Sequence, residues 1–128
     1  MEIITLSNGK KVANFSSPHS FTFEDGSVLP AVSDVDAEHF KVTFIEKIDN
    51  DGDVELQFKL SEPIISLINM WMNKYDNNEV DVVFCPLPMI TALKEHIHWR
   101  HNLKDSPFRA VRIEDRVKKL VSITKQCL

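Results

Sequence analysis

The sequence predicts an α+β domain in which an antiparallel or mixed sheet, built from hairpins, has two main helices packed on it. Two turns, at Asn8-Gly9 and Asp51-Gly52, each separate two extended runs, and such a turn is the strongest short-range signal for a hairpin. Two longer apolar stretches begin with residues typical of helix starts. Because strands outnumber helices, we expect the sheet to form the core of a single globular domain over residues 1–128.

The first part of the chain predicts two hairpins. Residues 2–6 and 10–15 flank Ser7-Asn8-Gly9, and residues 20–24 and 27–32 flank Asp25-Gly26. Pro30 interrupts the last of these runs. Since proline cannot donate to a ladder, we expect an edge strand or an early end there.

A short helix and a third hairpin are expected next. Ser33, followed three residues later by Asp36, has the spacing of a helix N-cap with an acid in the first turn, which predicts a helix over residues 34–40. Residues 41–48 and 54–60 both alternate apolar and polar side chains across a turn at residues 50–52. They should therefore pair as a hairpin.

The first main helix is predicted over residues 63–75. Ser61 is a suitable N-cap, and Pro63 lies in the first turn, where its missing N–H costs nothing. The apolar positions that share one helical face are Ile64, Leu67, Ile68, Trp71 and Tyr75. Asn77-Asn78 should end the helix, because asparagine accepts the left-handed conformation common after a helix C-terminus.

The segment over residues 81–85 is the best candidate for a central strand. Its hydrophobicity is continuous rather than alternating, which suits a strand covered on both faces. Pro86 and Pro88 should stop its pairing and begin a second main helix over residues 89–103. Two further strands, over residues 108–113 and 119–123, are expected to close the chain.

Composition indicates a soluble globular protein. The chain of 128 residues is 43% hydrophobic and 27% charged, and no apolar run approaches the roughly 18 residues that span a bilayer. The amino terminus lacks an apolar stretch of signal-peptide length, so we expect a cytoplasmic protein without membrane partners. Cys85 and Cys127 lie outside any CxxC pattern and are expected to be free thiols.

Charge is distributed unevenly along the chain. Residues 1–93 hold 6 Lys and Arg against 15 Asp and Glu, whereas residues 94–128 hold 9 against 4. A net charge of −4 argues against general nucleic-acid binding, which needs a basic surface. The basic last third can form a polarised surface, or it can pair with the acidic body within one chain or between subunits.

Three patterns suggest chemistry, and each has a simpler interpretation. The acidic run from Asp49 to Glu55 resembles a calcium loop, but it lacks the glycine and the final acid that an EF-hand needs, so a structural turn is favoured. His98 and His101, with His96 nearby, have helical spacing for a metal, yet no supporting ligand motif accompanies them, and solvated histidines are favoured.

The third pattern is Cys85, which precedes a helix as a nucleophilic thiol does. Pro86 and Pro88 remove backbone donors that would hold an anion there, so a buried cysteine that packs as a small hydrophobe is favoured. We therefore predict no catalytic residue, no metal ligand and no cofactor.

The basic segment near the C-terminus is the preferred site. In an extended run Arg109 shares a face with Val111 and Ile113, while Arg112 lies on the other face and Arg116 follows, with Lys118 and Lys119 behind it. An arginine on an apolar face needs a partner, which is either an acid of the body or another subunit, or a bound phosphate or carboxylate. Paired charges are favoured on general grounds, and a ligand role for Arg109, Arg112 and Arg116 is the sharper hypothesis.

Three segments together give a layout that resembles small uncharacterised proteins of tailed phages. They are NGKKVANFSSPHSFTFEDGSVLPAV near the start, VDVVFCPLPMITAL in the middle and SPFRAVRIEDRVKKLVSI near the end. The likeness covers about half of the chain, and residues 33–79 have no counterpart in it. It implies a viral accessory protein and transfers no active site.

These observations lead to three functional hypotheses. The first is a non-enzymatic, phage-type accessory protein that binds a host defence factor or a small nucleotide-like anion through Arg109, Arg112 and Arg116. The second is a homo-oligomeric structural or virion protein in which the acidic body of one subunit meets the basic segment of another. The third is a hydrolase that depends on the Cys85 thiol or on a metal at His98 and His101.

Overall fold

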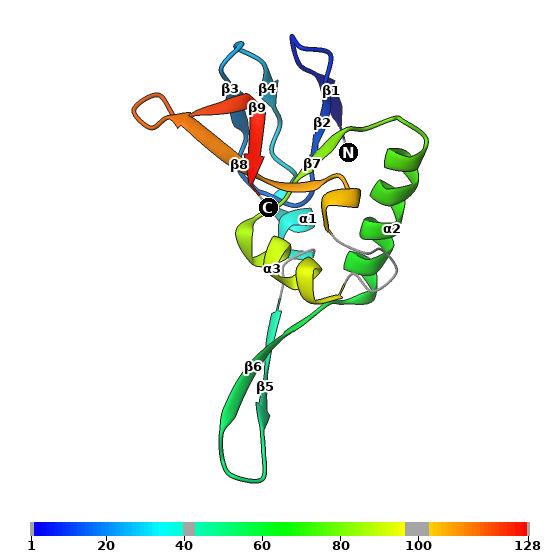
Figure 1. Ribbon diagram of the computed structural model, residues 1–128, viewed down its shortest axis with the longest axis vertical. Helices are drawn as coiled ribbons and strands as arrows, with labels where there is room; N and C mark the ends of the chain where they lie inside the picture. The colour runs from blue at the N-terminus through cyan, green and yellow to red at the C-terminus, as the bar shows by residue number, and fades with distance from the viewer. Residues whose placement is uncertain (1, 40–42, 97–102, 128) are drawn as a thin grey trace.

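The computed structural model in Figure 1 describes residues 2–39, 43–96 and 103–127. These residues form a mixed sheet of seven strands, a separate hairpin of two strands, three α-helices and one 3₁₀ helix. In chain order the elements are β1 (Ile3–Thr5), β2 (Lys11–Asn14), β3 (Phe21–Phe23), β4 (Val28–Leu29), α1 (Asp34–His39), β5 (Thr43–Ile48), β6 (Val54–Lys59), α2 (Glu62–Asp76), β7 (Val82–Phe84), α3 (Leu87–His96), η1 (Leu103–Asp105), β8 (Phe108–Asp115) and β9 (Leu120–Cys127).

The sheet combines hairpins with parallel pairs in the order β1-β2-β7-β8-β9-β3-β4. Its hairpins are β1 with β2, β3 with β4, and β8 with β9. Parallel pairs join β2 to β7, β7 to β8, and β3 to β9. The predicted α+β class and mixed sheet are confirmed, but the prediction of two helices packed on a sheet built from hairpins is wrong. The described residues form three α-helices and a nearly barrel-shaped sheet. Half of its strand pairs join segments distant in sequence, and the β5–β6 hairpin takes no part in it.

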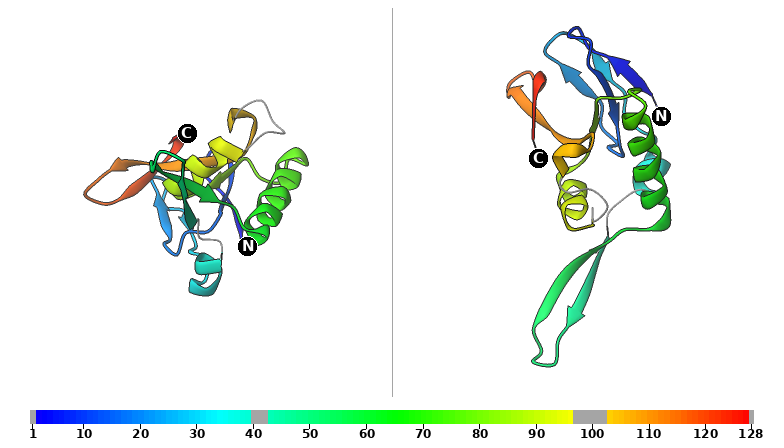
Figure 2. Two further views of the ribbon diagram at one scale, coloured as in Figure 1. Left: turned by 90° about the horizontal axis from the view of Figure 1, so that it is seen from below. Right: turned by 45° about the vertical axis from the view of Figure 1, so that its right-hand side comes forward.

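The sheet curls until it is nearly a barrel, with β2 and β4 approaching each other across the gap (Figure 2). The Asn14 side-chain amide at the end of β2 donates a hydrogen bond to the carbonyl of Pro30, just beyond β4, at 3.2 Å. The backbone N–H of Val32 donates to the carbonyl of Ser17 at 3.0 Å. These bonds connect the two strands where no ladder joins them, so the sheet curls over on itself instead of ending in two distant edges.

Strand β7 separates two apolar cores because all of its side chains are buried and alternate in direction. Val83 faces α2 and α3, in a core that also contains Trp71 and Phe108. Val82 and Phe84 face the inside of the curled sheet, toward strands β3, β4 and β9. The predicted central strand covered on both faces is therefore confirmed.

The helix starts and ends follow the local signals in the sequence. The Ser61 hydroxyl accepts the N–H of Ile64 at the start of α2, and the Ser33 hydroxyl accepts the N–H of Asp36 at the start of α1. Asn78, just after α2, adopts a φ of 59°, as expected of an asparagine that ends a helix.

Helix α3 begins two residues before the helix predicted over residues 89–103. It covers Leu87–His96, and Leu103 instead begins the 3₁₀ turn η1. Residues 97–102 lie outside the described part of the chain. Across the described ranges, none of the helices combines the length and the apolar character that a bilayer span requires.

Candidate functional site

The hairpin formed by β8 and β9 carries the candidate site. The register of the pair shifts twice, with extra residues in β9 between the pairs of Val111 and Ile113, and one extra residue in β8 between the pairs of Ile113 and Asp115. Such bulges change the direction in which successive side chains point. Val111, Arg112 and Ile113, which would alternate between faces in a regular strand, all line one hollow next to the first of these shifts.

The turn of this hairpin is held by one carboxylate. Asp115 Oδ1 accepts the N–H groups of Val117 and Lys118, each at 3.0 Å. The turn then ends at Lys119, whose φ of 56° lies in the left-handed region that a lysine rarely adopts. This conformation returns the chain into β9.

The hollow beside this turn has a volume of about 660 Å³. Its lining residues are Val111, Arg112, Ile113, Arg116, Lys119 and Cys127. The cationic side chains among them are exposed, whereas Val111 and Cys127 are half-buried. The hollow therefore combines an apolar surface with positive charges that reach into water. We call it the cationic hollow.

One acid competes for these charges. Glu114 Oε1 lies 3.8 Å from Arg112 Nε and 3.8 Å from Lys125 Nζ, and 54% of the Arg112 side chain is exposed. Exposed pairs of this kind contribute about 0–1 kcal/mol. Glu114 is therefore a weak competitor that an anion with better geometry can displace from Arg112.

Arg109 lies apart from Arg112 and Arg116 and does not line the hollow. Its guanidinium Nη1 donates to the carbonyls of Leu103, Ser106 and Phe108 at 3.1, 2.8 and 2.7 Å, and Nη2 donates to Lys104 at 3.0 Å. Burial lowers the pKa of Arg109, although the nearby Tyr75 and Cys85 partly oppose this shift. The predicted trio of arginines is thus divided. Arg109 closes the turn before β8, and only two arginines meet.

Two lining residues were not assigned to the site from the sequence. In the sequence Lys119 was noted only as a charge that follows the arginines, and its unusual φ cannot be predicted from the sequence. Cys127 belongs to β9, which runs further than predicted and pairs with Ala110 at the start of β8. Had the final strand been predicted to reach residue 127, its pairing with the preceding strand would have placed Cys127 near the arginines.

Cys85 is a buried side chain in the helix-facing core, as favoured from the sequence. It is 5% exposed, and its thiol donates to the carbonyl of Val83 at 3.6 Å. Burial raises the pKa of Cys85 well above its ordinary value, and the charge of Arg109 opposes this only in part. The thiol therefore stays protonated at neutral pH, which does not support a nucleophilic role.

The other chemical patterns form no site among the described residues. The Asp49 carboxylate accepts the N–H groups of Asp51 and Asp53 at 2.9 Å, so it holds the tight turn between β5 and β6 as predicted. His98 and His101 lie outside the described residues. Within residues 2–39, 43–96 and 103–127, no three His, Cys, Asp or Glu side chains are placed to hold a metal.

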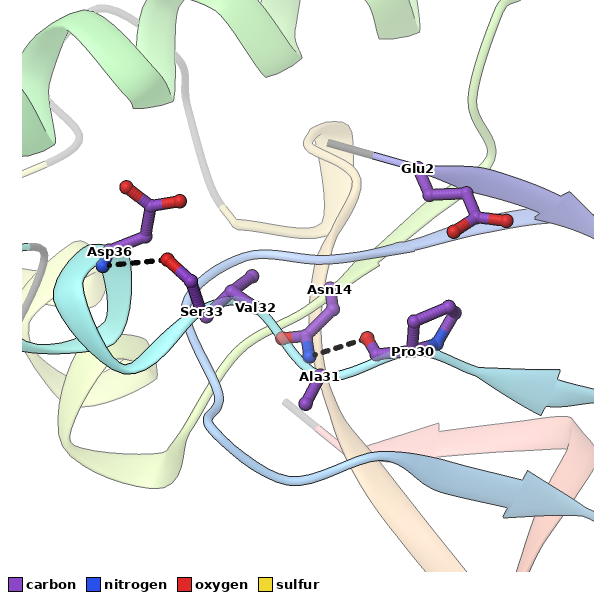
Figure 3. Close-up of a pocket in the computed structure, with 7 residues that line it drawn as sticks. All are labelled: Glu2, Asn14, Pro30, Ala31, Val32, Ser33 and Asp36. Carbon is purple, nitrogen blue, oxygen red and sulfur yellow. Dashed lines mark hydrogen bonds between the residues drawn. The ribbon is translucent and has the colours of Figure 1, made fainter.

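A second, smaller hollow of about 260 Å³ lies near the gap between β2 and β4 (Figure 3). It is lined by Glu2, Asn14, Pro30, Ala31, Val32, Ser33 and Asp36. The Asn14 side chain is fully engaged, because it donates to Ser17 and Pro30 and accepts the N–H of Ser17. With its amide committed to the fold and two acids beside it, this hollow does not suit an anion.

Among the residues that the structure describes, the cationic hollow is therefore the best candidate for a binding site. Its six lining residues include cations and apolar side chains but neither a carboxylate nor an imidazole. An arrangement of this type is suited to holding an anion. Comparisons with protein-family models, with curated proteins and with solved structures find no match to this chain.

Proposed function

We propose that this protein is a non-enzymatic binding protein that takes a nucleotide-like anion in the cationic hollow. The observation that carries the proposal is the meeting of Arg112, Arg116 and Lys119 around one hollow with an apolar lining. These residues come from β8 and from the turn that follows it. Lys119 takes the place that the sequence had suggested for Arg109.

The cations suit phosphate groups. A guanidinium presents a planar fork of donors that matches two phosphate oxygens at once, and lysine adds a compact charge. Arg112 and Arg116 are exposed, so neither has to leave a buried partner in order to bind. Binding would exchange the weak contact of Arg112 with Glu114 for a charge-assisted contact with a dianion.

The apolar lining suits a base or a similar flat group. Val111, Ile113 and Cys127 supply this part of the hollow, and Ile113 is 40% exposed before any ligand covers it. The volume of about 660 Å³ falls in the range of about 300–1,000 Å³ usual for small-molecule sites. Phosphates at the cations and a base on the apolar side chains would fill both parts of the site.

The proposed biological role is that of an accessory protein of the tailed-phage type. The resemblance noted in the sequence supports this role, which is to withdraw a nucleotide signal from a host defence system by binding it. Sequestration requires affinity and no catalysis. The hollow, which has cations but neither a carboxylate nor an imidazole among its lining residues, supports anion binding better than a hydrolysis that uses such a base.

Isothermal titration with a panel of linear and cyclic nucleotides tests the proposal. The wild-type protein should give heat with at least one member. The double variant Arg112→Gln/Arg116→Gln should bind that nucleotide at least about tenfold more weakly, because it loses charge-assisted contacts. Lys118→Gln is the matched control, since Lys118 is exposed in the same turn but does not line the hollow.

The titration results distinguish binding in the hollow from binding elsewhere and from no nucleotide binding. Binding that survives in the double variant would place the ligand elsewhere. No heat with any nucleotide would overturn the small-anion proposal and leave a host protein as the partner to seek, by pull-down with wild-type protein and with the double variant.

A further inference from the structure

The β5–β6 hairpin projects away from the body of the molecule. Figure 1 shows it at the lower end of the long axis, and the right-hand view in Figure 2 shows the same separation. In the sheet topology β5 and β6 pair only with each other. A two-stranded ribbon alone is marginally stable in water, so a projecting hairpin of this kind gains stability when it packs against a partner.

The end of this hairpin combines apolar and acidic side chains. Ile48 and Val54 form the last cross-strand pair before the turn, and they are 69% and 56% exposed. Asp51 and Asp53 in the turn and Glu46 in β5 are exposed as well. Residues 46–54 hold four Asp and Glu against one lysine. We call this end, residues 46–54, the acidic tip.

The cationic hollow has the complementary composition. Residues 108–127, which make up β8, the turn and β9, hold six Lys and Arg against two Asp and Glu. The hollow offers apolar side chains at Val111, Ile113 and Cys127 and cations at Arg112, Arg116 and Lys119. Each of the two surfaces thus pairs apolar contact area with charge, and the charges are opposite in sign.

The acidic tip cannot contact the cationic hollow of its own chain. The acidic tip lies at the lower end of the long axis in Figure 1, whereas the β8–β9 turn lies beside the curled sheet in the upper half. We propose that the acidic tip of one copy of this protein docks on the cationic hollow of a second copy. Ile48 and Val54 would then cover the apolar lining, and Asp51 and Asp53 would meet the cations.

The two surfaces lie far apart on one chain, so the contact joins unlike patches. Two copies can close it by exchanging tips reciprocally, and otherwise successive copies form a ring or a filament. This inference is independent of the proposed ligand, although both use the same hollow. If both hold, a bound nucleotide and the acidic tip compete.

Sedimentation or light scattering at rising salt tests the assembly directly. The wild-type protein should exceed the mass of one chain at low ionic strength and dissociate as salt screens the charges. Charge reversal on either side, as Asp51→Lys/Asp53→Lys or as Arg112→Glu/Arg116→Glu, should weaken self-association at least about tenfold through like-charge contact. All four residues are exposed, so both variants should fold.

A charge swap makes the test specific. One chain carrying all four reversals should assemble again, because its positive tip meets a negative hollow. Reversal at Asp36 in α1 and at Glu79 after α2, which are both exposed, is the control for a general change in net charge, and it should leave assembly unchanged. A mixture of the two separate double variants should associate better than either alone. The positive tip of one variant meets the negative hollow of the other, and the unaltered tip of the second meets the unaltered hollow of the first.

Three results would overturn the inference. The first is a wild-type protein that stays a monomer at low salt and about 0.1 mM concentration, well above a micromolar dissociation constant. The second is a pair of charge-reversal variants whose assembled mass equals that of wild type. The third is a four-residue swap that fails to restore assembly. Nucleotide heats from the earlier titration are a separate measurement. A monomer that binds nucleotide keeps the proposed function and removes self-docking, and an assembly without nucleotide heat does the reverse.

Discussion

The carboxylate of Asp25 accepts the backbone N–H of Ser7 at 2.8 Å and so joins the turns of the first two hairpins. It also accepts the N–H of Ser27 within its own turn at 2.9 Å. These two bonds, the one from Ser7 foremost, lower the pKa of Asp25 from 3.8 to about 2. The acid therefore helps to close one end of the curled sheet, where strands β1 and β3 have no ladder between them.

This pairing predicts a dependence of stability on pH. Because the pKa is lower in the folded protein, Asp25 stabilises the fold above about pH 4, and this contribution is lost as the pH falls from about 3.8 toward 2. The melting temperature of wild-type protein should exceed that of Asp25→Asn at pH 6, and the difference should shrink steadily below pH 4. A difference that stays constant down to pH 2 would contradict the assigned role.

Arg109 should matter for stability and not for ligand binding. Arg109→Lys keeps the charge, but a single ammonium cannot reach carbonyls of Leu103, Lys104 and Ser106 together, so half-buried acceptors lose their donor. The expected cost is about 1–3 kcal/mol of unfolding free energy, measured by urea denaturation. Arg112→Lys is the matched control, because an exposed substitution usually stays within about 0.5 kcal/mol. Equal costs for the two variants would contradict this division of roles.

The separation of Arg109 from Arg112 and Arg116 could not be predicted in full from the sequence. Local signals placed most elements well, since a capping serine, an Asn-Gly turn or a proline acts on its immediate neighbours. Alternation also predicted that Arg109 and Arg112 differ in direction. The register shifts between β8 and β9, however, depend on how the two strands pair, and no local pattern reports them.

The prediction of which strands pair was incomplete for the same reason. The parallel pairs of β2 with β7 and of β3 with β9 join residues far apart in sequence, as in Val12 with Val82 and Thr22 with Leu120. Such contacts are decided by the whole fold, whereas hairpins are decided by their turns. The continuous apolar character of β7 was the one local sign of a parallel, doubly covered strand.

Asn14 should control the gap between β2 and β4. Its side chain is 4% exposed and bonds to Ser17 and Pro30, so Asn14→Ala leaves buried groups without partners at a cost of about 1–3 kcal/mol. Hydrogen exchange should report the change locally. The amide of Val32, which donates to Ser17, should exchange faster, whereas that of Val83, which donates to Pro107, should not.

Asn14→Asp serves as the second arm of this experiment. The carboxylate still accepts the N–H of Ser17, but it replaces the donor with an acceptor beside the carbonyls of Ser17 and Pro30. It should therefore destabilise the protein at least as much as alanine does. A harmless Asn14→Asp would show that the donated bonds contribute little to holding the strands together.

Lys119 should show a conflict between stability and binding. It holds a left-handed φ of 56° that costs a lysine about 1–2 kcal/mol and costs glycine nothing, yet it brings a cation to the hollow. We expect Lys119→Gly to raise the unfolding free energy by up to about 1 kcal/mol, after the greater freedom of the unfolded glycine is subtracted. The same variant should weaken nucleotide binding about tenfold or less, as expected for the loss of one charged contact.

Asn78→Gly separates the two effects, because Asn78 has nearly the same backbone conformation, with a φ of 59°, but lies after α2 and away from the hollow. It should stabilise the fold less than Lys119→Gly does, since asparagine tolerates this conformation better than lysine, and it should leave binding unchanged. Urea denaturation and titration calorimetry on the two variants give both quantities. A Lys119→Gly protein that is more stable and binds nucleotide as tightly as wild type would show that Lys119 is not part of the site. A Lys119→Gly protein that is less stable than wild type would show that the lysine side chain, and not the backbone conformation, determines the stability of the turn.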